Sequence, residues 1–168
     1  MVATSLWLAF YPSGVNVSSK WVCYTNKNSY WGLNMNIESY ADLIREASVQ
    51  PEPQRLMFVF AKAELPRGYT EAQQERFANQ QGGTLAPVLC VDKLPEEIED
   101  FSVLVEESTH TGIDWDIAFV AALGGRGGFA PNSDEAAQPL KMMMEKIQGG
   151  MIADFLTFNK HGELVALY

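Results

Sequence analysis

The stretch RLMFVFA, from Arg55 to Ala61, carries most of the information about the fold class. Every residue after the arginine is apolar, and such a run is typical of a strand covered on both faces of its sheet. Two further runs follow the same pattern: TLAPVLCVD from Thr84 to Asp92, and WDIAFVAAL from Trp115 to Leu123. Pro87 cannot donate to a ladder, so the Thr84–Asp92 strand is expected at an edge or with a bulge.

Helical patterns precede and separate these strands. The segment Ile37–Ala47 has apolar residues at helical spacing, with Asn36 as its expected N-cap. The segment Thr70–Gln73 is a capping box that predicts a short helix. Pro95 then stands near the first turn of a further helix. The inner face of that helix is expected to hold Ile98, Phe101, Leu104, Val105 and Ser108.

Pro139 determines where the last helix is expected to begin. Ser133 is a suitable N-cap, but a helix starting there would hold Pro139 six positions inside, at a cost of about 3 kcal/mol. We therefore expect a start near Gln138, with Pro139 at the first helical position. The buried stripe would then be Leu140, Met143, Met144 and Ile147.

The order of these patterns predicts the architecture. Two apolar runs, at 151–158 and 163–168, flank Asn159–Gly162, which is typical of a C-terminal β-hairpin. Because strands alternate with helices, we expect an α/β protein with a mostly parallel or mixed sheet of about five strands and flanking helices. Residues 35–168 are expected to form this single domain.

Residues 1–34 differ in composition from the remainder of the chain. They contain no Asp or Glu, whereas all 21 acidic residues lie from Met35 onward. We therefore expect residues 1–34 to be a non-native or disordered leader, with Met35 as the true start. The alternative is a strand or arm added to the domain.

Charge and cysteine content exclude several functional classes. The net charge of −9 argues against nucleic acid and against an anionic membrane surface as partners. No apolar run approaches the roughly 18 residues of a membrane-spanning helix. Cys23 and Cys90 are the only cysteines, and no CxxC motif is present, so we expect a reduced, cytoplasmic protein.

The sequence AALGGRGGFAPNSDEA, from Ala121 to Ala136, is the stretch that most resembles a ligand loop. Its segment Gly125–Ala130 formally matches the dinucleotide pattern G-x-G-x-x-G/A. The helix does not open within the glycines, no acid follows the next strand, and the Lys and Ser/Thr of a P-loop are missing. We therefore expect no cofactor.

If the strands are parallel, their carboxyl ends meet at one edge of the sheet, where ligands bind in such folds. Turn amides there would form an anion-binding nest, and Arg126 would hold a carboxylate or phosphate. A mobile turn with a solvated arginine is the alternative. The candidate ligand-binding residues are Glu64, Arg67, Asp92, Lys93, Gly124, Gly125, Arg126, Gly127 and Gly128.

Metal and nucleophile chemistry have little support in the sequence. His110 and His161 are the only histidines, and neither has a clustered acid or cysteine nearby, so no metal site is expected. The DWD motif at Asp114–Asp116 begins a strand and is interpreted as a pair of solvated acids. No GxSxG motif is present, and Cys90 lies in an apolar run typical of an inert buried thiol.

Four blocks of the chain share a further likeness: QPEPQRLMFVFAKAELP, APVLCVDKLP, TGIDWDIAFVAALGGRGG and GGMIADFLTF. Together they resemble a family of small proteobacterial proteins that are often labelled "ribonucleotide reductase subunit alpha". The resemblance covers most of residues 36–168. Reductase catalysis needs a thiyl-forming cysteine and a redox pair, whereas residues 35–168 contain only Cys90. The resemblance thus implies at most an accessory role.

Two functional hypotheses follow. The first is a non-catalytic accessory module that binds a small anionic ligand or a protein partner, including a second copy of the chain, through the loops near Glu64, Asp92 and Arg126. The second is a small enzyme at the same edge, with Asp92 or Glu64 as base and the glycine turn with Arg126 as anion holder. The absence of a nucleophile motif, a metal cluster or a complete cofactor fingerprint favours the first.

Overall fold

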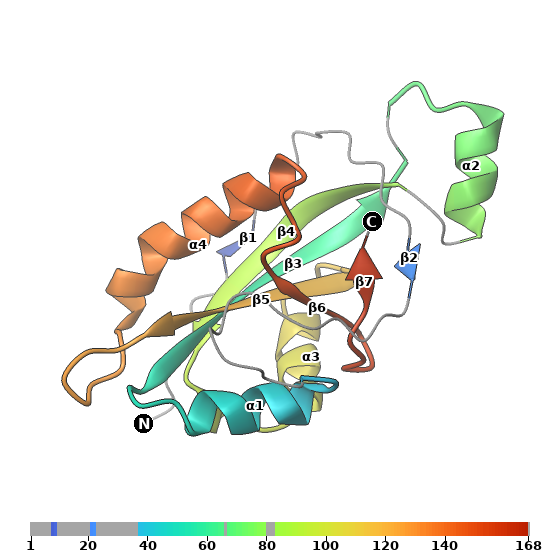
Figure 1. Cartoon of the computed structure of the whole chain (residues 1–168). Coiled ribbons are helices and arrows are strands. Elements are labelled where there is room, and N and C mark those ends of the chain that lie inside the picture. Colours follow the sequence, from blue (N-terminus) through green and yellow to red (C-terminus); the bar gives the residue numbers. More distant parts are fainter. Residues whose placement is uncertain (1–7, 10–20, 23–36, 66, 80–82, 168) are drawn as a thin grey trace.

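The fold is organised around the central strand β3 (Gln54–Glu64), which pairs with β4 (Thr84–Lys93) on one side and with β5 (Ile117–Gly124) on the other. The computed structural model describes residues 8–9, 21–22, 37–65, 67–79 and 83–167. Strand β6 (Leu156–Asn159) lies beside β5, and β1 (Leu8–Ala9) lies beside β4, so the order is β1-β4-β3-β5-β6 (Figure 1).

The prediction of a mostly parallel or mixed sheet is wrong, because every pairing in this sheet is antiparallel. Helix α2 (Glu71–Ala78) buries no side chain, and the chain turns through it from β3 into the adjacent β4. Helix α3 (Phe101–Thr109) does lie in a crossover, but it carries the chain past β3 to β5. Because the connection through α2 turns the chain straight back, β4 runs opposite to β3, and the α3 crossover then leaves β5 parallel to β4 but beside β3, so that β5 also runs opposite to β3.

The connection from β5 to β6 also places neighbouring strands antiparallel. Helix α4 (Ser133–Gln148) runs back along the sheet, and residues 149–155 reverse the chain once more before β6 begins (Figure 1). Strand β6 consequently enters the sheet antiparallel to β5, with Leu156 opposite Val120 and Asn159 opposite Ile117. The described residues thus form an α/β protein with an antiparallel sheet and four α-helices.

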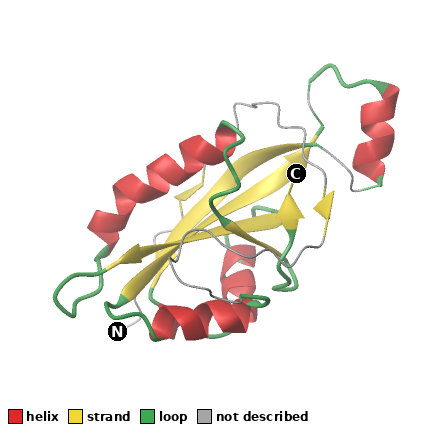
Figure 2. Cartoon of the chain, in the orientation of Figure 1, coloured by secondary structure: helices red, strands yellow, loops and turns green. Residues whose placement is uncertain are grey.

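Helices cover the sheet on both faces, as the continuous apolar runs predicted (Figure 2). Helices α1 (Tyr40–Ser48) and α3 pack on one face, where β3 presents Leu56, Phe58 and Phe60. Helix α4 packs on the other face, against Met57, Val59 and Ala61. Because successive side chains of a strand point to opposite faces, a strand between two helical layers must be apolar at every position.

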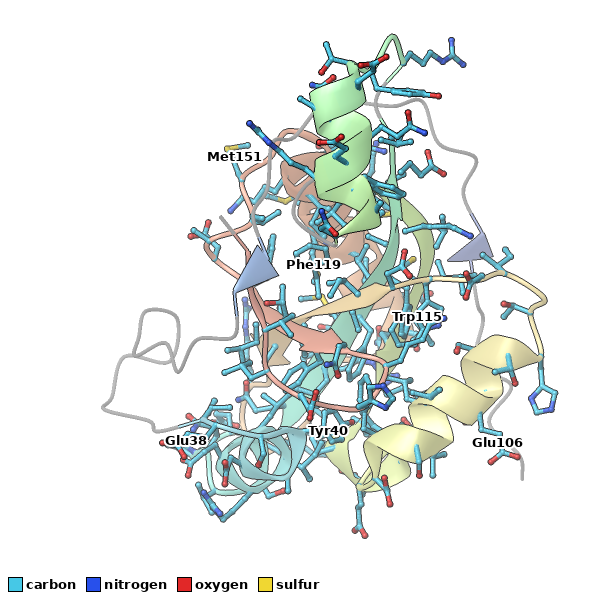
Figure 3. All side chains as sticks on the ribbon, turned by 90° about the vertical axis from the view of Figure 1, so that its right-hand side faces the viewer. Glu38, Tyr40, Glu106, Trp115, Phe119 and Met151 are labelled. Atoms are coloured by element: carbon cyan, nitrogen blue, oxygen red, sulfur yellow. The ribbon has the colours of Figure 1, made fainter. Side chains whose placement is uncertain are left out.

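Aromatic side chains fill the core beneath α1 and α3. The Tyr40 and Phe101 rings lie with centroids 4.9 Å apart, and those of Phe60 and Trp115 lie 4.8 Å apart. Tyr40 donates its hydroxyl hydrogen bond to the Ile98 carbonyl at 2.8 Å. Burial, with a smaller contribution from the charge of nearby Asp100, raises the pKa of Tyr40 above its ordinary value. Figure 3 shows Tyr40 and Trp115 on this side of the sheet, whereas Phe119 belongs to the α4 side.

Capping residues explain several helix starts. Ser39 rather than Asn36 caps α1, forming a capping box with Asp42, and Asn36 lies outside the described residues. The box at Thr70–Gln73 is confirmed for α2. The single helix expected from Pro95 is instead a 3₁₀ turn, Pro95–Glu97, followed by α3 with Asp100 as its own N-cap. The expected inner face is confirmed: Ile98, Phe101, Leu104 and Ser108 are buried and Val105 packs against the core.

The predicted start of the last helix is wrong. Helix α4 begins at Ser133, so Pro139 lies inside it. Asn132 and Glu135 form a capping box, and Ala136 is fully buried against the sheet. Local capping and packing of the first turns thus outweigh the helical hydrogen bond that Pro139 cannot donate. The buried stripe is confirmed, with Leu140, Met143 and Ile147 buried and Met144 packed against them.

Parts of both termini are described. Leu8 and Ala9 lie opposite Cys90 and Leu89. Strand β2 (Trp21–Val22) pairs with β7 (Ala166–Leu167). The rest of residues 1–34 lies outside the described residues, so the leader, and the alternative of an added strand, stay predictions. The turn at Asn159–Gly162 is confirmed, with Gly162 at φ +75°. No described helix is long and apolar enough to cross a membrane.

Replacing Pro139 by alanine should stabilise the protein. About 3 kcal/mol is regained in the helix, less roughly 1 kcal/mol for the greater freedom of the unfolded chain. We therefore expect Pro139→Ala to raise the free energy of unfolding by about 2 kcal/mol, measured by urea denaturation followed by circular dichroism. An unchanged or lower value would show that Pro139 costs this helix nothing.

Candidate functional site

The antiparallel sheet divides the predicted site residues between two ends of the molecule. Strands β4 and β5 both finish at the start of β3, with Lys93 opposite Leu56 and Gly124 opposite Gln54. Glu64 ends β3 at the opposite end, about 30 Å away along the strand, and Arg67 follows it towards α2. The expectation that three strand exits share one edge is therefore wrong, because it depended on parallel strands.

Asp92 and Lys93 point to opposite faces of the sheet, although they are adjacent in sequence. Lys93 is 4% exposed on the α3 side, where its Nζ donates to Glu107 Oε2 at 2.7 Å. Asp92 lies on the α4 side. Since consecutive strand residues point to opposite faces, the two cannot contact one ligand together.

Asp92 belongs to a closed polar cluster with Arg55 and Ser133. Arg55 Nε and Ser133 Oγ both donate to Asp92 Oδ2, at 2.8 Å and 2.7 Å, and Arg55 Nη2 donates to Ser133 Oγ at 2.8 Å. The Arg55 and Asp92 side chains are only 12% and 16% exposed. The cluster ties β3, β4 and the first residue of α4 together at the end where β5 exits.

Cys90 lies two residues before Asp92 on the same strand. The side chain is 1% exposed, and burial, with a smaller contribution from the charge of Asp92, raises the pKa of the thiol to about 11. A thiol in this state is protonated and inert at neutral pH. The interpretation of Cys90 as a buried core residue is therefore confirmed.

The glycine-rich loop is a tight hairpin. Arg126 and Phe129 exchange both backbone hydrogen bonds, at 3.0 and 3.1 Å, across Gly127 and Gly128. These two glycines have φ of +60° and +83°, as a type I′ turn requires at both central positions. A Cβ on Gly125 would lie 2.0 Å from the Phe129 carbonyl oxygen. Backbone geometry by itself accounts for these three glycines.

Four amides of this loop are already engaged within the protein. Gly125 donates to the Pro53 carbonyl oxygen, and Gly128 donates to Glu52 Oε2 at 2.7 Å. The amides of Arg126 and Phe129 form the hairpin. Such amides are not available to form an anion nest. The Arg126 side chain is exposed, and none of the ion pairs in the described part of the chain includes it.

Exposed apolar side chains accompany this hairpin. Phe129 is 79% exposed. Val49, the C-cap residue of α1, is 67% exposed. The α1–β3 and β5–α4 connections lie at the same end of the molecule (Figure 1). We call Glu52, Arg126 and Phe129 together the Phe129 surface. Sequence patterns indicated Arg126 but gave no sign of Phe129, since an isolated Phe after glycines resembles any loop residue.

The acids of the DWD motif have structural partners. Asp114 accepts hydrogen bonds from Lys160 and Lys62, which lower the pKa of its carboxyl group. Asp116 accepts the amide hydrogen of Ala63 at 2.9 Å and so extends the pairing of β3 beyond Ala61. Within the described ranges, no group of three or more His, Cys, Asp or Glu side chains is placed to hold a metal ion.

Comparison with family models, with curated proteins and with solved structures finds no match to this chain. The resemblance to the small proteobacterial proteins stays a prediction.

Replacing Asp92 should destabilise the fold, because the largely buried Arg55 would lose its carboxylate partner. We expect Asp92→Asn to lower the free energy of unfolding by about 1–3 kcal/mol. The matched control is Asp114→Asn, because Asp114 is 61% exposed in its ion pairs with Lys62 and Lys160 and a loss below about 1 kcal/mol is expected. Equal losses in urea denaturation would contradict a supporting role for the cluster.

Gly125 should be the least replaceable glycine of the loop. Gly125→Ala would force its methyl group against the backbone oxygens of Phe129 and Pro53, which cannot move without opening the hairpin. At Gly124 the nearest atom is the flexible end of Gln54 at 3.4 Å, so Gly124→Ala is the control. We expect a loss of stability on the order of 2 kcal/mol for the first and under about 1 kcal/mol for the second. A tolerated Gly125→Ala would contradict the close backbone approach.

Proposed function

We propose that the chain is a non-catalytic accessory module that binds a protein partner through the Phe129 surface. The observation that carries this proposal is Phe129 itself, a 79% exposed aromatic ring on a hairpin fixed by backbone hydrogen bonds. Aromatic and arginine side chains supply much of the energy of protein interfaces. A preformed turn also loses little conformational entropy on binding. An accessory role agrees with what the sequence resemblance implies.

A small anionic ligand at this end has weaker support. Four of the loop amides donate within the protein, and Arg55, a largely buried cation, is held by Asp92 and Ser133. Arg126 remains as a single solvated guanidinium. One exposed charge binds a small anion weakly, because solvent screening reduces its attraction.

The enzyme alternative loses the geometry on which it depended. Its two candidate bases, Glu64 and Asp92, lie towards opposite ends of β3. Asp92 Oδ2 already accepts hydrogen bonds from Arg55 and Ser133, and the adjacent Cys90 thiol is buried. A general base must reach a substrate proton directly or through one water, and these contacts oppose that role for Asp92.

Loss of Phe129 should remove partner binding while the fold persists. The tagged chain and its Phe129→Ala variant are each expressed in cells of the organism from which the chain comes. We expect the amount of partner that co-purifies with Phe129→Ala to be lower by about tenfold or more. The control is Met142→Ala, which truncates a 50% exposed side chain on the outer face of α4 and should change nothing. Quantitative mass spectrometry of the co-purified proteins makes the measurement. Equal retention by both variants would contradict the proposal.

A further inference from the structure

We infer that the partner of the Phe129 surface presents an apolar pocket with a carboxylate at its rim, filled by Phe129 and bound by Arg126. This inference rests on the proposed function and adds the chemistry of the partner. This partner is a different protein rather than a second copy of the chain.

The hairpin geometry couples the two side chains. Arg126 and Phe129 are a directly opposed, hydrogen-bonded antiparallel pair. Directly opposed residues place their side chains on the same face of a ribbon, with Cβ atoms about 5.5 Å apart. The aromatic ring and the guanidinium therefore leave the hairpin together and meet the same part of any partner.

The chemistry of each side chain specifies what it would contact. A ring that is 79% exposed gains most by entering an apolar pocket. A guanidinium presents paired N–H donors that match the two oxygens of a carboxylate. Together they require an acidic group at the rim of the pocket.

Two acids of the segments that adjoin the hairpin are engaged by backbone amides. Glu52 Oε2 accepts from the Gly128 amide, and Glu135 Oε2 accepts from the Asn132 amide in the α4 capping box. No salt bridge of the described residues includes Arg126. Within the described residues Arg126 is therefore available to pair with a carboxylate of the partner.

A second copy fits this surface less well. Each copy carries a net charge of −9, so close approach of two copies is opposed electrostatically. A stable interface buries about 1,200 Å² or more, whereas a hairpin tip offers only a few side chains. A heterologous pocket that surrounds the tip buries more area for each residue of this chain.

The test places a photo-crosslinking phenylalanine analogue, p-benzoylphenylalanine, at position 129 of the full chain, and at position 142 as a control. Adducts formed in the source cells are mapped by mass spectrometry, and the partner is then purified for binding measurements. We expect adducts specific to position 129 on apolar pocket residues with an Asp or Glu beside them. We also expect Arg126→Glu to weaken binding about tenfold or more and Arg126→Lys to weaken it less.

The decisive result is rescue by charge exchange. Replacing the partner's carboxylate by Lys should restore binding to Arg126→Glu, whereas Arg67→Glu, the same change at an exposed arginine near α2, should leave binding unaltered. If Phe129→Ala abolishes binding but Arg126→Glu does not weaken it, the proposed function stands and this inference is overturned. Adducts to a second copy of the chain would also overturn it. Adducts no more frequent at position 129 than at position 142 would overturn both proposals.

Discussion

The antiparallel pairing of β3 with both of its neighbours is the constraint on which the rest of the structure depends. The strand is buried between α1 and α3 on one face and α4 on the other, so its alternating side chains belong to two separate cores. Its direction, opposite to that of β4 and β5, brings their exits to the start of β3. A slip of one residue would exchange the two cores and turn Arg55 towards the wrong helix.

The same register produces the polar cluster beside the hairpin. Arg55 and Asp92 lie on the α4 face of neighbouring strands, and α4 begins with Ser133 above them. A largely buried arginine is tolerated there because both of its partners are fixed by secondary structure. The cluster therefore anchors the start of α4 and, through it, the connection from β5.

Rigidity and exposure are combined in the hairpin itself. Its backbone is held internally by the Arg126–Phe129 pair and externally by Pro53 and Glu52. Glycines provide the conformations that this arrangement needs, and the side chains at the two flanking positions extend outward. The loop whose sequence most resembled an anion cradle thus presents Arg126 and Phe129 on a backbone held in place by hydrogen bonds.

The sequence by itself determined the local structure: three apolar strands, the capping box of α2, the inner faces of α3 and α4, and a buried Cys90. These features follow from periodicity and short-range capping, which act within a few residues. It could not determine strand direction. The same order of strands and helices occurs whether a connection turns straight back, crosses to the adjacent strand or skips a strand. Nor could it show that Ser39 caps α1, or that α4 accepts Pro139 in exchange for burying Ala136. Only the tertiary structure decided that Glu64 lies far from Asp92, that Asp92 binds Arg55 and Ser133, and that Phe129 stands exposed beside Arg126, because these relations arise from pairings between segments distant in the chain.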